Sequence, residues 1–374
     1  MIGRILSDNI KKDFFQGKII VVLGPRQVGK TTLMNQLQLD HSVTLSLNCD
    51  DPIDAASIEN VSSTDLHSLI DGFRYVVIDE AQRVKNIGLT LKMIADIFKD
   101  SIQVLVTGSS SFDLTDEINE PATGRLYEYY LFPVSLPELA TQTQWREVQK
   151  QLSARLIYGS YPEVINRPGQ AERILKELAD NYLYKDLLSY KGMRKPDVLM
   201  RLLQALSLQV GSEVSFNEIS RLVGIDKVTV ENYITLLEKC FIIFRLPSFS
   251  RNMRTEIRKG KKVYFYDNGI RNAIIRNFAP MELRTDGGLL WENLIISERV
   301  KRNAYANHFA NLYFWRTQEQ QEIDLIEEIN GTLTAYEFKR NKTKAALPQA
   351  FRKSYGDIDF QVITPENMKS FLAI

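Results

Sequence analysis

The sequence predicts an α/β protein in which a domain built on a parallel sheet is followed by a helical region, a winged helix and a small α/β domain. The chain has 374 residues, which is long for a single compact domain. Its first third alternates short, continuously apolar runs with amphipathic stretches, the pattern of a parallel sheet covered by helices on both faces. The pattern becomes helical from about Trp145 and mixed again from about Pro280.

The strands and helices follow from these runs. Apolar β-branched runs predict the parallel strands 18–23, 43–47, 75–78 and 103–106. Helical periodicity predicts 31–39, 88–98, 151–157, 171–188 and 196–208. The last region predicts a helix at 289–302 and strands at 312–316, 322–328, 332–340 and 360–364. We therefore expect domains at 1–145, 206–278 and 279–374, with a helical lid or linker at 146–205.

The composition excludes several classes of protein. Hydrophobic residues make up 44% and charged residues 25%, so the chain is neither collagen-like nor disordered. The formal net charge is only +1, so any nucleic-acid contact must come from local clusters. Two cysteines and three unclustered histidines exclude a disulfide scaffold and argue against zinc. No apolar run approaches the roughly 20 residues that span a bilayer, so we expect a cytoplasmic protein without membrane contact.

A phosphate-binding loop is the most specific motif. Residues 24–31, GPRQVGKT, fit G-x-x-x-x-G-K-[ST] and stand between a predicted strand and a predicted helix. Backbone N–H groups of such a loop and the helix N-terminus bind phosphate, and Lys30 would bridge the β- and γ-phosphates. The Thr31 hydroxyl would bind Mg²⁺. The residues expected to contact the nucleotide are Gly24, Pro25, Arg26, Gln27, Val28, Gly29, Lys30, Thr31, Thr32 and Ser109.

The next two strand ends supply candidate catalytic groups. Asp79 and Glu80 end an apolar strand; Asp79 would hold the magnesium and Glu80 would act as general base toward water. Ser109 follows the strand 103–106 and would sense the γ-phosphate, unless it only caps the next helix. Arg125 could stabilise transition-state charge in its own or a neighbouring subunit, although a surface salt bridge is the commoner role.

A winged helix is predicted between residues 206 and 278. A capped helix begins at Ser215, Gly224 forms a turn, and 226–239 forms a second helix ahead of strands 241–246 and 262–266. Seven basic residues and one acid, Glu256, lie between 245 and 262, as phosphate contacts require. The basic residues are Arg245, Arg251, Arg254, Arg258, Lys259, Lys261 and Lys262. Winged helices also bind proteins, so both DNA and protein partners remain open.

Carboxylates in the last domain could form a metal site. Glu337 and Lys339 lie on one face of a predicted strand, and Asp324 lies on the preceding strand. If these strands are neighbours, Asp324 and Glu337 could share a magnesium that activates water, with Lys339 stabilising charge. Glu292 on the upstream helix is a further candidate ligand. The alternative is a surface hairpin with cross-strand ion pairs.

The chain resembles prokaryotic AAA-superfamily ATPases fused to a C-terminal domain of unknown function with a PD-(D/E)xK nuclease-like core. The resemblance spans nearly the whole chain and rests on 24–32, 77–82, 106–110, 124–125, 158–163, the winged-helix stretch through 268, and 291–293 with Asp324 and 337–339. It implies adenine specificity and an ATP-driven or ATP-gated switch coupled to a DNA-associated module. It does not establish cleavage, because fold likeness does not fix activity.

We therefore expect a Mg²⁺-dependent ATPase, with ATP and Mg²⁺ as cofactors, whose nucleotide state positions a winged helix and a nuclease-like domain on DNA. The alternative is an ATP-gated regulatory or scaffold switch that binds proteins, or a second copy of itself, and whose C-terminal domain cuts nothing. A self-contained nuclease that uses ATP only for stability is a third reading. Cleavage assays with and without ATP separate the three.

Overall fold

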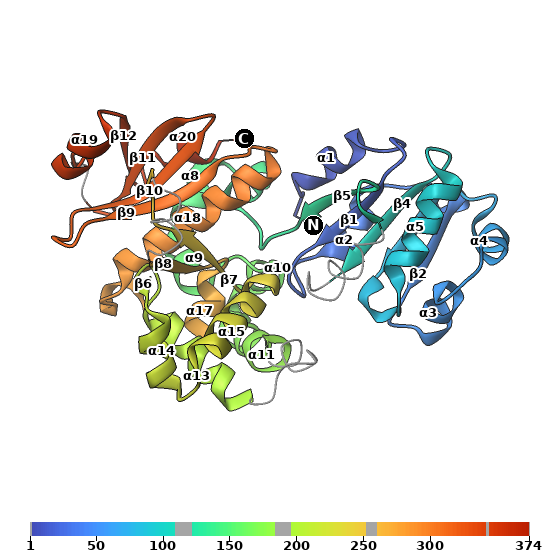
Figure 1. Cartoon of the computed structure of the whole chain (residues 1–374), viewed down its shortest axis with the longest axis horizontal. Coiled ribbons are helices and arrows are strands. Elements are labelled where there is room, and N and C mark those ends of the chain that lie inside the picture. The colour runs from blue at the N-terminus through green and yellow to red at the C-terminus, as the bar shows by residue number, and fades with distance from the viewer. Residues whose placement is uncertain (1, 109–121, 184–195, 252–259, 342–343, 374) are drawn as a thin grey trace. The chain divides into compact units, whose positions relative to one another are not determined.

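The computed structural model describes residues 2–108, 122–183, 196–251, 260–341 and 344–373 (Figure 1). They form two compact units. Unit 1 comprises Met1–Pro133 with Lys239–Phe241, and unit 2 comprises Val134–Glu238 with Ile242–Ile374. The finer division of unit 2 into lid, winged helix and last domain stays a prediction.

Unit 1 is built on a five-stranded parallel sheet with the strand order β2-β3-β4-β1-β5 (Figure 1). Its strands are β1 (Ile19–Leu23), β2 (Thr44–Asn48), β3 (Tyr75–Asp79), β4 (Gln103–Gly108) and β5 (Leu126–Tyr130). Its helices are α1 (Leu6–Lys12), α2 (Lys30–Gln36), α3 (Pro52–Ile58), α4 (Ser63–Ile70) and α5 (Ile87–Phe98). The four strands expected in this region are confirmed, and β5 is an addition.

The apolar runs form the centre of this sheet. Every residue of β1 and β4 is buried, as expected for strands covered on both faces. Chain order and spatial order differ, because β4 lies between β1 and β3. The carboxyl ends of these three strands therefore meet at one edge of the sheet, where the phosphate-binding loop leaves β1.

Unit 2 begins with helices and continues into two sheets. Its helices are α7 (Leu136–Gln142), α8 (Trp145–Lys150), α9 (Leu152–Tyr158), α10 (Pro162–Asn166), α11 (Ala171–Glu177), α13 (Pro196–Leu208), α14 (Phe216–Val223), α15 (Lys227–Lys239), α17 (Asn268–Ile274), α18 (Gly287–Tyr305), α19 (Gln349–Tyr355) and α20 (Met368–Leu372). Its strands are β6 (Glu213–Val214), β7 (Ile243–Pro247), β8 (Lys261–Phe265), β9 (Asn311–Arg316), β10 (Glu322–Ile329), β11 (Thr332–Phe338) and β12 (Asp359–Ile363). A π-helical segment, Leu178–Leu183, follows α11.

The middle of unit 2 has a three-helix, three-strand arrangement. The elements follow in the order α13, β6, α14, α15, β7 and β8, and β8 pairs antiparallel with both β6 and β7. The Ser215 hydroxyl accepts a hydrogen bond from the Glu218 N–H and so caps α14. Gly224, in the left-handed conformation at φ 77°, ends that helix.

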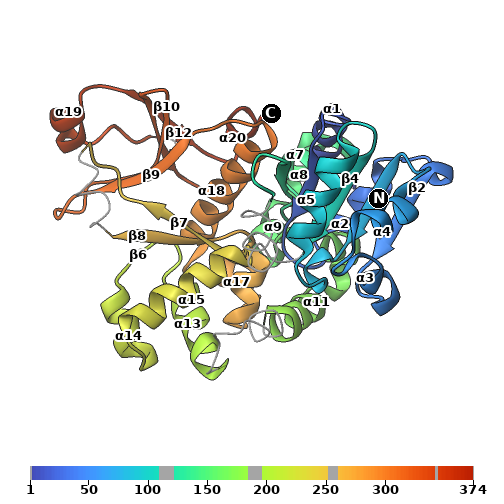
Figure 2. The same cartoon turned by 45° about the vertical axis from the view of Figure 1, so that its right-hand side comes forward.

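The last part of unit 2 is a four-stranded sheet with the order β12-β11-β10-β9. The neighbours β9, β10 and β11 are antiparallel, whereas β12 is parallel to β11. Helix α18 lies beside this sheet (Figure 2). An apolar cluster that includes Phe249, Trp315, Ile323, Ile326 and Phe351 forms part of its core. All four expected strands are present.

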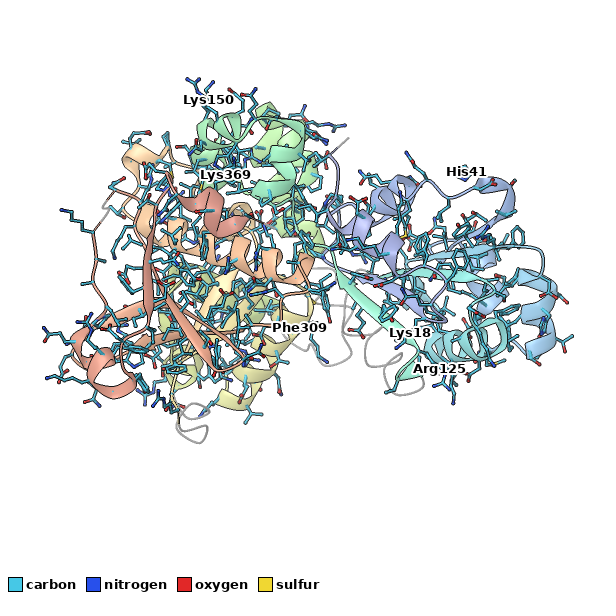
Figure 3. The ribbon with its side chains drawn as sticks, turned by 90° about the horizontal axis from the view of Figure 1, so that it is seen from above. Lys18, His41, Arg125, Lys150, Phe309 and Lys369 are labelled. Atoms are coloured by element: carbon cyan, nitrogen blue, oxygen red, sulfur yellow. The ribbon has the colours of Figure 1, made fainter. Side chains whose placement is uncertain are left out.

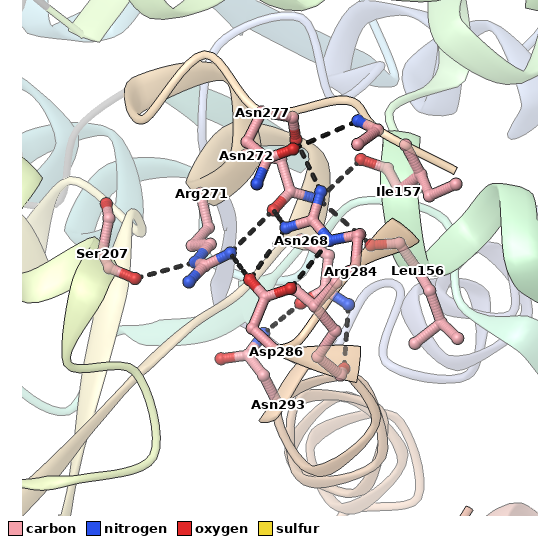
Figure 4. A network of polar contacts seen from close by, with 12 residues as sticks. Leu156, Ile157, Ser207, Asn268, Arg271, Asn272, Asn277, Arg284, Asp286 and Asn293 are labelled. Carbon is pink, nitrogen blue, oxygen red and sulfur yellow. Dashed lines mark hydrogen bonds and ion pairs between the residues drawn. The ribbon is translucent and has the colours of Figure 1, made fainter. Parts of the chain in front are cut away.

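A buried polar network joins the helices of unit 2 (Figure 4). Arg271 on α17 donates to the Ser207 carbonyl at 2.8 Å and pairs with Asp286 at 2.6 Å. Arg284 also pairs with Asp286, at 2.8 Å. The side-chain amide of Asn272 donates to the carbonyls of Leu156 and Ile157 in α9. The network therefore holds together four segments, which belong to three of the regions expected from the sequence. Among the helices that the structure describes, none is long and apolar enough to cross a bilayer.

Candidate functional site

The phosphate-binding loop joins β1 to α2 in unit 1. Gly29 has φ 97° at the N-cap of α2, a left-handed conformation that glycine adopts without strain. Gly24 lies so close to the backbone of Leu131 that a Cβ there would clash with the Leu131 carbonyl. Both glycines of the motif are thus required by the backbone, and the first N–H groups of α2 follow directly after the loop.

Lys30 is held inside the loop. Its side chain is buried, and its ammonium group donates to the carbonyls of Gly24 and Pro25, each at 3.0 Å. The positive charge is therefore placed against the concave backbone of the loop, where a phosphate chain would lie.

The expected magnesium ligands lie next to each other. The Thr31 hydroxyl donates to Asp79 Oδ2 at 2.8 Å, although the two residues are far apart in sequence. One hydroxyl and one carboxylate are oxygen ligands of the kind that Mg²⁺ takes alongside water and phosphate. The donor set at the end of β3 therefore fits a magnesium ion bound together with a nucleotide.

The acidic pair is completed by Thr107, a buried residue at the end of β4 that the sequence reasoning did not select. Its hydroxyl donates to Asp79 Oδ1 and accepts from the Glu80 N–H at 3.3 Å. Glu80 itself is in the left-handed conformation at φ 54°, and its carboxylate accepts a hydrogen bond from Gln82. Thr107 thus holds the carboxylate of Asp79 and the backbone of Glu80.

Arg4 supports the loop from outside the motif. Its buried guanidinium donates to the Val28 carbonyl at 2.9 Å and to the Phe132 carbonyl at 2.5 Å. Its backbone N–H donates to Gln36 at the end of α2. The segment before α1 therefore braces the loop and the helix that follows it. Nothing in the local sequence marks an arginine 20 residues before Gly24 as part of the site.

Of the other expected residues, one lies outside the described residues and one is not at this site. Ser109 lies outside the described residues. Arg125, labelled in Figure 3, directly precedes β5 at the edge where the strands begin. It pairs with Asp96 at 2.6 Å. The loop lies at the opposite, carboxyl end of β1, about 15 Å away at 3.3 Å per strand residue. A role for Arg125 in the nucleotide site of its own subunit is therefore wrong in this structure; a role in a neighbouring subunit stays a prediction.

A second cluster of charged residues lies in unit 2. Three carboxylates surround Lys262 of β8, and they are Glu292 (α18), Glu322 and Asp324 (both β10). Glu337 (β11) lies near Asp324, and Lys339 follows β11. Lys262 is only 2% exposed and pairs with Glu292 at 3.1 Å and with Glu322 at 2.5 Å. Tyr264 donates to Glu292 at 2.6 Å, and Lys339 pairs with Glu337 at 2.5 Å. The structure therefore brings the three expected acids together and adds three unexpected members.

Asp324 is the most buried acid of this cluster. The antiparallel register of β10 and β9 shifts between Ile323 and Ile326, which re-aims the intervening side chains. One carboxylate oxygen accepts from the Phe338 N–H at 2.7 Å. Burial, together with the nearby Glu292 and Glu337, raises the pKa of Asp324 well above its usual value.

Lys262 carries the compensating charge. Burial alone would lower its pKa, but the carboxylates around it outweigh that effect and raise the pKa. Burial, with a hydrogen bond to Glu292, also raises the pKa of Tyr264. Among the described residues, no three His, Cys, Asp or Glu are arranged to hold a metal ion. The expected ligands Glu292, Asp324 and Glu337 are close, but their carboxylates are engaged elsewhere.

The predicted basic cluster at 245–262 is reduced by these contacts. Lys262 is buried among carboxylates, so its expected role as a phosphate contact is wrong. Arg245 pairs with Glu238, and Arg251 lies over the Tyr355 ring. Arg254, Arg258 and Lys259 lie outside the described residues. Seven basic residues and one acid give the segment 245–262 a formal net charge of +6. These contacts show that this sum overstates the free positive charge at its surface.

Three protein-family models match separate segments of the chain. Residues 16–140 match an AAA domain family, 149–280 a domain of unknown function (DUF8612), and 287–369 another domain of unknown function (DUF4143). With its five-stranded parallel sheet and phosphate-binding loop, the amino-terminal part has the fold of a P-loop nucleoside triphosphatase.

Relatives match most of the chain at low sequence identity. An uncharacterized protein of Mycobacterium tuberculosis is 26% identical over 363 residues, covering 95% of this chain and 77% of its own length. One of Haemophilus influenzae is 26% identical over 283 residues, covering 71% of this chain and 67% of its own. Among solved structures, a Walker-type ATPase of Pyrococcus abyssi is similar at a TM-score of 0.49 and 15% identity, covering 74% of this chain and 96% of that one.

Proposed function

We propose that the protein binds and hydrolyses ATP with Mg²⁺, and that its nucleotide state controls a DNA-associated winged-helix and nuclease-like region. The observation that carries the first part is the contact between Thr31 and Asp79, because it joins the loop to the acidic strand end as a magnesium site requires. Lys30 would neutralise phosphate charge, and Glu80 would accept the proton of the attacking water. Thr31 and Asp79 would hold the magnesium, which when bound would supply Lewis-acid stabilisation of phosphate charge.

Replacing Glu80 with Gln tests this assignment. The variant keeps the loop, Lys30 and the magnesium ligands but lacks the base, so we expect unchanged ATP affinity and at least about 100-fold slower hydrolysis. The control is Gln149→Glu on α8, in unit 2. Gln82→Glu would not serve as a control, because it adds a charge beside Glu80. Hydrolysis at the wild-type rate by the Glu80→Gln variant would refute the role of Glu80.

The proposal for unit 2 rests on topology and on the carboxylate cluster. The order α13, β6, α14, α15, β7, β8 with β8 central is the order of a winged helix, and we propose that α15 and the loop between β7 and β8 approach DNA. Exposed side chains near the start of α15 include Lys227 and Asn232. The Thr229 hydroxyl is bound to Asp226 and is less available for base contact.

Helix α18 and strands β10 and β11 would supply the nuclease-like core. Glu292, Asp324 and Glu337 have the oxygen donors that a magnesium ion takes, and Lys339 would stabilise charge on a phosphate. Cleavage of plasmid and linear DNA with Mg²⁺ or Mn²⁺, with and without ATP, tests this. Cleavage that disappears in Glu337→Ala supports the nuclease, and its dependence on ATP reports coupling.

An ATP-gated switch without cleavage is the second candidate. The observation that favours it is the engagement of the acids by Lys262, Tyr264 and Lys339. It predicts no cleavage under any of these conditions and unchanged behaviour of an Asp324→Ala, Glu337→Ala variant. Cleavage lost in that variant rejects it.

A further inference from the structure

We propose that Gln82 is a positioning residue for ATP hydrolysis, which holds the Glu80 carboxylate in place through a side-chain hydrogen bond. This inference rests on the proposed function and adds a residue that acts on the reaction only through Glu80. In the proposed reaction a water oxygen bonds to the γ-phosphorus, the bond from that phosphorus to the β–γ bridging oxygen breaks, and its electron pair stays on ADP. The proton of the water passes to one oxygen of the Glu80 carboxylate.

The contacts that fix the backbone of Glu80 do not fix its side chain. Glu80 has φ 54°, a left-handed conformation that residues other than glycine rarely adopt. Its N–H donates to the Thr107 hydroxyl at 3.3 Å, and its carbonyl accepts from the Arg83 N–H at 3.0 Å. Both bonds hold the main chain only. A glutamate side chain has several rotatable bonds, so its carboxylate needs a contact of its own to keep one orientation.

Gln82 supplies a contact to that carboxylate. Its side-chain amide donates to Glu80 Oε2. A hydrogen bond from an amide N–H to a carboxylate is charge-assisted and stronger than one between neutral groups. The bond takes one oxygen of the carboxylate, so Oε1 is the oxygen that accepts the proton of the water. Because the amide carries no charge, it orients the Glu80 carboxylate without neutralising it, as an arginine or lysine partner would.

The turn that carries Gln82 is held from both sides. Residues Ala81–Arg83 form a 3₁₀ turn directly after Glu80, and the Ala81 side chain is fully buried. On one side Arg83 pairs at 3.1 Å with Asp50, which lies just after β2. On the other side Thr107, near the end of β4, binds the Glu80 N–H. Since β3 lies between β2 and β4, the turn is attached to both neighbouring strands, and the Gln82 side chain starts from a fixed backbone.

Steady-state phosphate release by the full chain with ATP and Mg²⁺ tests the proposal. Methionine matches glutamine in length and volume but lacks the amide. We expect Gln82→Met to lower kcat about tenfold and to leave KM for ATP unchanged, because Lys30 and Thr31 keep their contacts. Gln16→Met is the matched control, and its kcat should equal that of the wild type. The Gln16 amide donates to the Lys12 carbonyl at 3.0 Å, ahead of β1 and at the opposite edge of the sheet.

A double variant separates positioning from a purely structural role. In the Glu80→Gln background, adding Gln82→Met should slow hydrolysis no further, because a residue that acts through Glu80 then has no base to position. A residue that only supports the turn would slow hydrolysis by the same factor in both backgrounds. If Gln82→Met does not fold, Gln82→Asn replaces it. Its shorter side chain withdraws the amide from Glu80, and the same tenfold loss of kcat is expected.

The outcomes distinguish failure of this inference from failure of the proposed function. Hydrolysis at the wild-type rate by Glu80→Gln would overturn the role of Glu80 and, with it, the role of Gln82. Slow hydrolysis by Glu80→Gln together with a wild-type kcat in Gln82→Met would leave the base standing and overturn the positioning by Gln82. Equal slowing by Gln82→Met in both backgrounds would overturn it as well. So would a raised KM with an unchanged kcat, because Gln82 would then act on ATP binding.

Discussion

Replacing Thr107 with Val tests whether this residue positions the catalytic groups of the nucleotide site as well as stabilising unit 1. Valine keeps the shape of threonine but removes the hydroxyl. In this fully buried position the hydroxyl serves the Asp79 carboxylate and the Glu80 N–H. A hydrogen bond to a charged group contributes about 1.5–3 kcal/mol and one between neutral groups about 1 kcal/mol. We therefore expect Thr107→Val to lower the free energy of unfolding by about 2–4 kcal/mol.

Thr90→Val is the matched control. Thr90 is also buried, in α5 of the same unit, and its hydroxyl donates to the Ile58 carbonyl at 3.0 Å, away from the acidic pair. It should lose about 1 kcal/mol of stability. Urea denaturation gives the stabilities, and a phosphate-release assay at saturating ATP gives the rates. Only Thr107→Val should slow hydrolysis, by about tenfold or more, because Glu80 and Asp79 lose their common partner. Equal rates for the two variants would refute this reasoning.

Two further predictions concern Arg4 and Asp286. Arg4→Met should weaken ATP binding about tenfold, because two backbone carbonyls lose a charged hydrogen-bond donor and the loop loses the side chain that supports it. Binding of a fluorescent ATP analogue measures the affinity, and an unchanged affinity would contradict this prediction. Burial alone would raise the pKa of Asp286, but hydrogen bonds from Arg284 and Arg271 outweigh it and lower the pKa to about 2 from the usual 3.8. The resulting stability, about 1–2 kcal/mol, is present above pH 4 and is lost as the pH falls toward 2. Urea denaturation at pH 6 and pH 3 should show this loss in the wild type and a smaller one in Asp286→Asn; identical losses would count against it.

The central strands of unit 1 could be predicted because their burial is a local property of the sequence. Continuous apolar runs became β1 and β4, both buried along their whole length. Strand β5 was missed because its sequence, LYEYY, mixes tyrosines with an acid, and its residues are only partly buried at the edge of the sheet. Strand β6 has only two residues and exists because β8 pairs with it.

The residues of the candidate sites could also be predicted only in part. The loop, Asp79 and Glu80 could be predicted because fixed spacing and strand ends mark them. Thr107 could not, because its contact with Asp79 depends on β4 lying between β1 and β3, an order that sequence does not display. Lys262 was misread as a surface cation because the acids that bury it come 30 and 60 residues later in the chain.

The most direct test of the central claim is isothermal titration of the protein with ATP in the presence of Mg²⁺. The variants to compare are Lys30→Ala and Lys18→Ala; Lys18 directly precedes β1 at the opposite edge and lies over the Tyr127 ring at 4.9 Å. We expect one ATP per chain in the wild type and in Lys18→Ala. In Lys30→Ala the affinity should fall at least about 100-fold, because the phosphates lose their buried cation. Wild-type affinity in Lys30→Ala would contradict the assignment of the nucleotide site.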